Sequence, residues 1–181
     1  FNIDRGGWWF WKPNDNLRVG AVAQIRMQAW DDDDGHLRDV KPLPGGFADP
    51  DTKVEPGVNV RYKRDRFAAE AQATYGEDIN ALLELKYNLM QSDQFVVTAA
   101  LGVEYLSEDE VSYQWYGEKS SIDNDSATNV SLGINAIQTL TPSWKLLYGV
   151  KTTSLDDEIE DSPVGQDDSY TVLSLGAAWS F

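Results

Sequence analysis

The chain contains one histidine, His36, the residue type best suited to acid–base catalysis near neutral pH. It follows four consecutive aspartates and a glycine, and a neighbouring carboxylate could orient its ring as a general base. No nucleophile can be assigned to this histidine from the sequence. The strongly polar surroundings favour a solvated loop residue instead. We therefore predict a protein that is not an enzyme.

The same acidic run is the candidate metal site, although a weak one, and comprises Asp31, Asp32, Asp33 and Asp34. The calcium-loop pattern fails here. If Gly35 took the invariant glycine position, the first ligand would be Trp30 and the twelfth Lys41. Loose binding of divalent cations and a solvated charged loop are the two interpretations. The chain has no cysteine, which excludes disulfides and thiolate sites. We predict no cofactor.

A third set of candidate residues is charged and recurs at alternate positions of strand-like segments. Alternation places these side chains on one face of each strand, opposite an apolar face. They could form cross-strand ion pairs that fill the interior of a barrel, or line a polar conduit. The length of the Arg and Glu side chains favours a filled interior. The predicted lumen-facing charges are Arg18, Arg26, Glu55, Arg61, Glu70, Glu84, Lys86 and Glu104.

The strand that indicates the fold most clearly is the last one, residues 170–181. Its alternate positions from Leu173 to Phe181 are apolar, and the positions between them are mostly small or polar. A soluble protein rarely ends on an exposed Trp-x-Phe, whereas a transmembrane barrel carries aromatic girdles on its lipid face. We predict that this segment closes an outer-membrane β-barrel, with Trp179 and Phe181 at its end.

Eight further segments alternate in the same way, so that the whole chain, residues 1–181, is predicted to be one all-β domain. The predicted fold is an antiparallel up-and-down transmembrane β-barrel with about nine strands in this chain. Pro56 is expected near the start of its strand, because proline cannot donate to a ladder. No segment approaches the ~20 apolar residues of a membrane helix. The segments are 1–12, 17–30, 53–63, 67–75, 81–89, 95–105, 129–136 and 144–151.

The connections between these segments alternate between short and long. Residues 13–16, 64–65, 91–93 and 141–143 form short turns; residues 31–52, 107–126 and 154–169 form long acidic loops; and residues 76–80 break the contrast. Short periplasmic turns and long outer loops are typical of outer-membrane barrels. This orientation would start the first strand outside the cell. An odd number of strands is therefore expected before Phe1, in a barrel of ten to twelve strands.

The net charge and the composition of the two strand faces distinguish a membrane barrel from a nucleic-acid-binding protein and from a soluble barrel. The net charge of −15 argues against nucleic-acid binding. A soluble barrel would point its apolar face inward and its charges outward. Here the polar faces carry both signs of charge among small residues, and aromatic residues flank several apolar faces, as with Phe67 and Tyr75 or Phe95 and Tyr105. These features favour a membrane barrel with a narrow lumen.

Three short motifs of the chain are informative together. The first is Asp31-Asp-Asp-Asp-Gly-His-Leu37, after the second predicted strand. The second is the loop Tyr113-Gln-Trp-Tyr-Gly117. The third is the segment from Leu155 to Val164, with its Asp-Ser-Pro-Val ending, followed by a closing strand that ends at Phe181. In these motifs the chain resembles the MipA/OmpV family of outer-membrane proteins (MltA-interacting protein).

The resemblance implies a location and a set of partners. The location is the outer membrane of a Gram-negative bacterium, in contact with lipid and lipopolysaccharide. The barrel-assembly machinery would recognise the terminal strand through Trp179 and Phe181. One family member is described as a scaffold that links a lytic murein transglycosylase to a penicillin-binding protein, and others are discussed as adhesins or porins. A non-enzymatic envelope scaffold is therefore the leading hypothesis, and a narrow channel for small polar solutes is the alternative.

Overall fold

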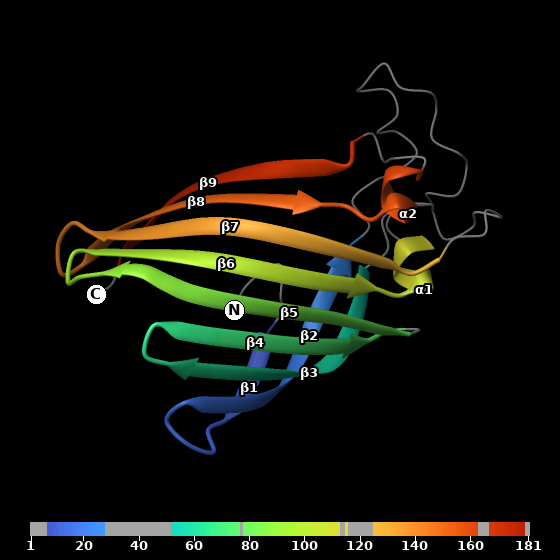
Figure 1. Ribbon diagram of the computed structural model, residues 1–181. Coiled ribbons are helices and arrows are strands. Elements are labelled where there is room, and N and C mark those ends of the chain that lie inside the picture. Colours follow the sequence, from blue (N-terminus) through green and yellow to red (C-terminus); the bar gives the residue numbers. More distant parts are fainter. Residues whose placement is uncertain are drawn as a thin grey trace.

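Nine strands form a single antiparallel sheet in the computed structural model, and their order in the sheet follows their order in the chain (Figure 1). The structure describes residues 7–27, 52–76, 78–112, 115, 125–162 and 167–179. The strands are β1 (Gly7–Trp11), β2 (Leu17–Met27), β3 (Thr52–Arg64), β4 (Phe67–Tyr75), β5 (Ile79–Gln91), β6 (Phe95–Leu106), β7 (Ala127–Thr139), β8 (Trp144–Ser154) and β9 (Ser169–Trp179). The predicted all-β, up-and-down fold with nine strands is confirmed.

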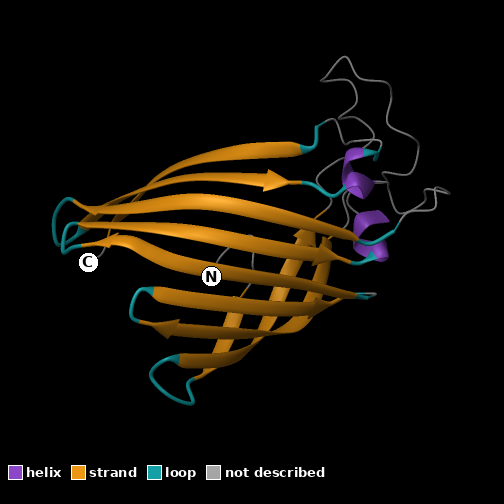
Figure 2. Ribbon diagram, in the orientation of Figure 1, coloured by secondary structure: helices purple, strands orange, loops and turns teal. Residues whose placement is uncertain are grey.

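The sheet is strongly curved, so that β1, β2 and β3 turn behind β4 and β5 like the wall of a barrel (Figure 2). Each strand pairs with its neighbours in the chain, and β1 and β9 form the two edges of the sheet. The register shifts once among these ladders, between Asn88 and Met90. A bulge of this kind increases the local twist and helps a sheet to bend.

Four of the five short connections lie at one end of the sheet, which we call the short-turn end (Figure 1). Residues 12–16, 65–66, 92–94 and 140–143 connect the strands there. The tightest of these turns places Asp65 at a positive φ of 53°, a conformation that aspartate tolerates better than most residues. The longer connections lie at the opposite end, together with the short connection between β4 and β5, which is the exception that the sequence predicts.

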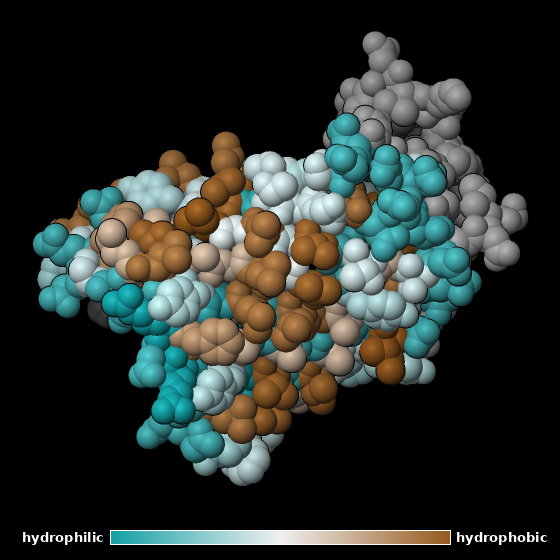
Figure 3. Space-filling view, in the orientation of Figure 1, coloured by the Kyte–Doolittle hydropathy of each residue, from teal (hydrophilic) through white to brown (hydrophobic). Residues whose placement is uncertain are grey.

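Polar side chains are buried on the concave, inner face of the sheet, and apolar side chains are exposed on the outer face. On β4 the side chains of Glu70, Gln72 and Thr74 are buried. On the outer face Leu173 is 80% exposed and Leu175 is 78% exposed. Figure 3 shows apolar side chains covering much of the outer surface. This arrangement is the reverse of a soluble barrel and matches a sheet that faces lipid.

Aromatic side chains mark both ends of the apolar outer surface. The register places Phe67 opposite Tyr87 near the short-turn end. Trp144 and Trp179 are also paired there, with ring centroids 6.5 Å apart. Tyr75 and Tyr105 are exposed toward the opposite end. Two aromatic bands of this kind are the girdles expected of a membrane barrel. None of the helices among the described residues is long and apolar enough to cross a membrane.

Two short helices, α1 (Glu108–Val111) and α2 (Asp157–Glu160), occur where the sequence predicts only loops. Ser107 caps α1 by accepting a hydrogen bond from the backbone N–H of Glu110, and Asp156 caps α2 in the same way through Glu158. The apolar residues of these helices pack into a small buried cluster. It consists of Leu106, Val111, Ala127 and Ile159, with Trp115 and Leu155 packed against them.

The position predicted for Pro56 is wrong by a few residues, since Pro56 is the fifth residue of β3 rather than close to its start. It pairs with Ala23 of β2. The ladder between β3 and β4 begins only at the next residue, Gly57, opposite Thr74. The missing N–H is tolerated because β3 is bordered by a ladder on only one side at this point.

The apolar cluster should hold the two helices in place. We expect Ile159→Ala to lower the free energy of unfolding by about 3 kcal/mol, because Ile159 is fully buried and its removal leaves a cavity. Urea unfolding in lipid vesicles measures this loss. The matched control is Ile134→Ala on the outer face of β7, where the residue is half exposed and no cavity forms. An equal loss in both variants would contradict the assignment of a core at this end.

Candidate functional site

The inner face of β2, β3 and β4 carries a connected network of buried amide and carboxylate groups. The Asn59 side-chain amide donates to Oε1 of Glu70 at 2.9 Å and to Oε1 of Gln72 at 3.1 Å. Gln72 in turn donates to Oε1 of Gln24 at 2.8 Å. Asn59 is fully buried. The network therefore joins three neighbouring strands through side chains as well as through the backbone.

Glu70 is the centre of this network because it also accepts a hydrogen bond from a charged side chain. Nη2 of Arg61 lies 2.8 Å from Oε1 of Glu70, and the pair is largely shielded from solvent. The guanidinium of Arg61 also lies over the ring of Phe10, 4.9 Å from its centroid. This cation–π contact brings β1 into the same cluster. Breaking a buried ion pair from one side is costly, because the remaining charge is left in a poorly solvated place.

Two further carboxylates of the inner face have partners on their own or a neighbouring strand. Glu55 is only 1% exposed, and its Oε2 accepts a hydrogen bond from the hydroxyl of Thr74 at 2.9 Å. On β5, Nζ of Lys86 lies 2.6 Å from Oε2 of Glu84. The inner face of β2–β5 is therefore filled by long polar side chains that bind one another.

The other predicted site residues are distributed as follows. Arg18 lies on β2 near the short-turn end and is exposed, and Glu104 lies on β6 opposite Leu82 and Asn129. Trp179 is exposed on the outer face of β9. The Arg26 side chain lies outside the described part of the chain, as do His36, the aspartates of residues 31–34 and Phe181. Their predicted roles remain predictions.

The inner face of β6–β9 differs from that of β2–β5 because small residues dominate it. A Cβ added at Gly102 would meet the Ser131 hydroxyl at 2.5 Å, and one at Gly149 would meet the Ser174 hydroxyl at 2.4 Å. A side chain at either glycine would therefore force the facing serine hydroxyl to turn away. Serine and glycine leave this half of the interior less filled than the opposite half.

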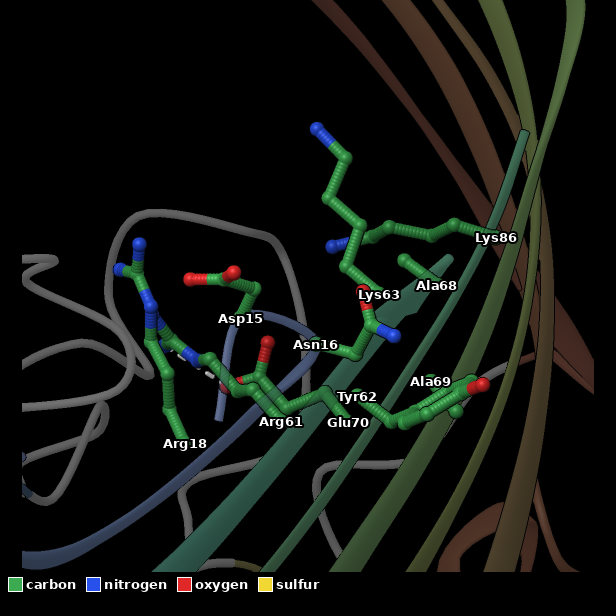
Figure 4. A pocket seen from close by; sticks show the side chains of 10 residues that line it. All are labelled: Asp15, Asn16, Arg18, Arg61, Tyr62, Lys63, Ala68, Ala69, Glu70 and Lys86. Carbon is green, nitrogen blue, oxygen red and sulfur yellow. Dashed lines mark hydrogen bonds and ion pairs between the residues drawn. The ribbon is translucent and has the colours of Figure 1, made fainter. Parts of the chain in front are cut away.

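A cavity of about 330 Å³ opens at the short-turn end of β2–β5 (Figure 4), and we call it the basic cavity. Its lining combines four cationic side chains with two carboxylates. Its volume is within the usual range for small-ligand sites. The lining residues are Asp15, Asn16, Arg18, Arg61, Tyr62, Lys63, Ala68, Ala69, Glu70 and Lys86.

The carboxylates at this cavity already have partners. Nζ of Lys12 lies 2.9 Å from Oδ1 of Asp15, and this hydrogen bond and the charge of Lys12 lower the pKa of Asp15, so that it stays ionised. Glu70 binds Arg61, and Lys86 binds Glu84. Among the described residues, no carboxylate lies within ion-pairing distance of Arg18 or Lys63. The cavity therefore has a surplus of positive charge.

Two features of the structure are not predicted from the sequence: the uncharged residues of the network and the two short helices. The uncharged members of the network, Gln24, Asn59 and Gln72, lie on the predicted inner faces, but the sequence does not distinguish them from other polar residues there. The short helices were also missed. The pattern Ser107-Glu-Asp-Glu110 matches a capping box, a serine followed three residues later by glutamate, and this signal would have placed α1.

The network has the features of a structural element, because its side chains connect neighbouring strands. Within the described ranges, no group of three or more histidines and carboxylates is placed to hold a metal ion. Most buried polar atoms of the network instead bind one another across the strands, although Oδ1 of Asn59 has no hydrogen-bond partner among the described residues. Such a network stabilises a barrel interior.

Comparison with protein families identifies the group to which the chain belongs. The family model described as MltA-interacting protein MipA matches residues 1–181. The chain is a member of the MipA family. Searches of curated proteins and of solved structures gave no significant match. The MipA family is a family of outer-membrane interaction proteins, and the curved antiparallel sheet with its apolar outer face agrees with a transmembrane barrel.

Removing the central carboxylate should disrupt the network. We expect Glu70→Ala to destabilise the protein by about 3 kcal/mol, because Arg61 and Asn59 would lose their shared acceptor in a buried setting. Urea unfolding in lipid vesicles measures the effect. Asp15→Asn removes the carboxylate of an exposed ion pair and should leave stability close to that of the unchanged protein. Equal effects of the two substitutions would contradict a central role for Glu70.

Proposed function

We propose that the protein is a non-enzymatic outer-membrane scaffold that binds a murein transglycosylase at its periplasmic side. Membership of a family named for its interaction with MltA supports the class of partner. The observation that carries the proposal is the buried polar network of Glu70, Asn59, Arg61, Gln72 and Gln24. These side chains occupy the interior of β2–β4, so that the barrel wall serves as a rigid support rather than as an open pore.

The short-turn end offers a surface that fits a periplasmic partner. Short turns face the periplasm in outer-membrane barrels. A hollow at this end is lined by basic and aromatic side chains, namely Tyr62, Arg64, Asp65, Arg66, Phe67 and Tyr87. Arginine and tyrosine contribute disproportionately to the binding energy of protein interfaces. We assign the transglycosylase to the turn at the rim of this hollow, where Arg64 and Arg66 are exposed, and the scaffold would link it to a penicillin-binding protein.

The remaining contacts of the protein follow from its outer surface. Membrane lipid would cover the apolar outer face, and lipopolysaccharide would meet the aromatic band toward the longer connections. The barrel-assembly machinery would bind the terminal strand through Trp179 and Phe181. These contacts belong to the same proposal of an envelope scaffold in a Gram-negative outer membrane.

Binding to the transglycosylase tests the proposal. We expect the detergent-solubilised protein to bind an immobilised MltA-type transglycosylase saturably in surface plasmon resonance. Arg64→Glu with Arg66→Glu should weaken binding about tenfold or more, since both side chains are exposed at the short-turn end.

The matched control reverses two charges at the opposite end of the sheet. Glu158→Lys with Glu160→Lys lies on α2 and should leave the affinity within about twofold, because it alters no residue of the short-turn end. The proposal is wrong if the unchanged protein does not bind, or if both pairs of substitutions weaken binding equally.

A second candidate function, a narrow channel for small polar solutes, is favoured by one observation. The inner face of β6–β9 is lined by small residues such as Gly102, Ser131, Gly149 and Ser174. A polar lining with little side-chain volume could leave a path for water and ions along this half of the interior.

Conductance in planar lipid bilayers distinguishes the two functions. We expect the unchanged protein to show no steady open conductance, because the polar network of β2–β4 fills the interior beside the small residues. Removing this filling with Arg61→Ala and Glu70→Ala should produce measurable ion flow. Thr98→Ala, which lies on the inner face of β6 away from the network, is the control and should stay closed. A steady open conductance of the unchanged protein would favour the channel and overturn the filled interior.

A further inference from the structure

We propose that the basic cavity binds a compact oxyanion, a phosphate or carboxylate group, between Arg18 and Lys63. The inference depends on the charges and geometry of the cavity alone and goes beyond the binding of a transglycosylase. It concerns the lumen side of the short-turn end, whereas the turn assigned to the transglycosylase presents Arg64 and Arg66.

The register of the strands places like charges opposite each other at this cavity. Arg18 on β2 pairs directly with Arg61 on β3. Directly opposed like charges on one face of a sheet destabilise it. Glu70, opposite Arg61 on the other side, offsets the charge of Arg61 through the ion pair described above. Arg18 gains no such compensation from the described residues, and an anion beside it would supply one.

The charges that surround the cavity sum to a positive excess. Along the inner face, Arg18, Arg61, Lys63 and Lys86 provide four positive charges, and Glu70 and Glu84 provide two negative charges. The charge of Asp15 is offset by Lys12. The excess of two positive charges contrasts with a chain whose net charge is −15. A doubly charged oxyanion such as hydrogen phosphate would balance it.

The wall of the cavity is fixed before any ligand binds. Oδ1 of Asn14 accepts hydrogen bonds from the backbone N–H groups of Asn16 and Leu17, both at 2.9 Å. The carbonyl of Asn16 accepts a hydrogen bond from the backbone N–H of Lys63 at 2.8 Å. The turn that carries Asp15 is therefore tied to the end of β3. A preorganised site loses less entropy when it binds.

The cationic side chains of β2, β3 and β5 share the lining of this one cavity, and Asp15 lies between Arg18 and Lys63 in the view of Figure 4. Figure 4 shows Arg18, Lys63 and Lys86 extending into the space beside the Arg61–Glu70 pair. Arginine presents a planar set of donors that matches the oxygens of phosphate and carboxylate, and lysine adds a mobile point charge. Positive charges within a partly enclosed, poorly polarisable wall attract anions more strongly than the same charges on a flat surface.

Isothermal titration calorimetry with inorganic phosphate tests the site, using the full chain in a neutral detergent at constant ionic strength. We expect saturable binding to one site. Arg18→Gln with Lys63→Gln should weaken this binding about tenfold or more, since both charge-assisted contacts are lost. Lys145→Gln with Lys151→Gln is the control, because it removes the same charge from the polar face of β8, and it should change the affinity by less than about twofold.

A measurement without substitutions covers the case in which the double variant does not fold. An amine-acylating reagent followed by mass spectrometry reports the accessibility of each lysine. Phosphate should slow the acylation of Lys63 and leave that of Lys145 unchanged. The proposal is overturned if phosphate does not bind saturably, if both double variants lose affinity equally, or if phosphate protects both lysines alike.

Nanodiscs of different lipid composition distinguish a lipid headgroup from a free solute as the source of the oxyanion. In nanodiscs of phosphatidylglycerol, the affinity for phosphate should fall relative to nanodiscs of phosphatidylcholine if a lipid headgroup occupies the cavity. Equal affinities in the two lipids, with competition by succinate, identify a free carboxylate or phosphate solute. Either result supports an oxyanion site, and retained transglycosylase binding by the Arg18 and Lys63 variant separates it from the scaffold function.

Discussion

The register of the antiparallel ladder is the constraint on which the remaining features of the structure depend. Side chains of a strand alternate between its two faces, so that a slip of one residue would turn every buried carboxylate toward lipid. The ladder connects Arg18, Arg61, Glu70 and Glu84 in one row across four strands. The polar network, the apolar outer face and the basic cavity are all consequences of this alignment.

Much of the fold could be predicted from the sequence because the information is local. Alternation identified all nine strands, and the contrast between polar and apolar faces indicated which face lies inside. The partners within the interior could not be predicted, because they depend on register between strands. The sequence marks Arg61 and Glu70 as inner-face charges, but not that Glu70 binds Arg61 and Asn59 rather than Lys86. The basic cavity was missed for the same reason, since Lys63 belongs to it only through its neighbours on β2, β4 and β5.

The interior of the sheet is divided into two halves with different roles. Long polar side chains on β2–β5 bind one another, whereas the glycines and serines of β6–β9 allow close contacts between neighbouring rows. The first half resists deformation because several hydrogen bonds must break together. The second half depends mainly on the backbone ladder. A rigid wall with exposed turns suits a protein that presents a docking surface to periplasmic partners.

The meander of the strands also has a consequence for the order of assembly. Every ladder joins strands that are adjacent in the chain, so no pairing has to bridge an intervening strand. Hairpins joined by short turns, such as β3–β4 and β7–β8, can form with little loss of chain entropy. The pairing of β2 with β3 spans residues 28–51 and carries a larger entropic cost. Assembly should therefore begin with the hairpins that have short turns, and the pairings across residues 28–51 and 107–126 should join these hairpins later.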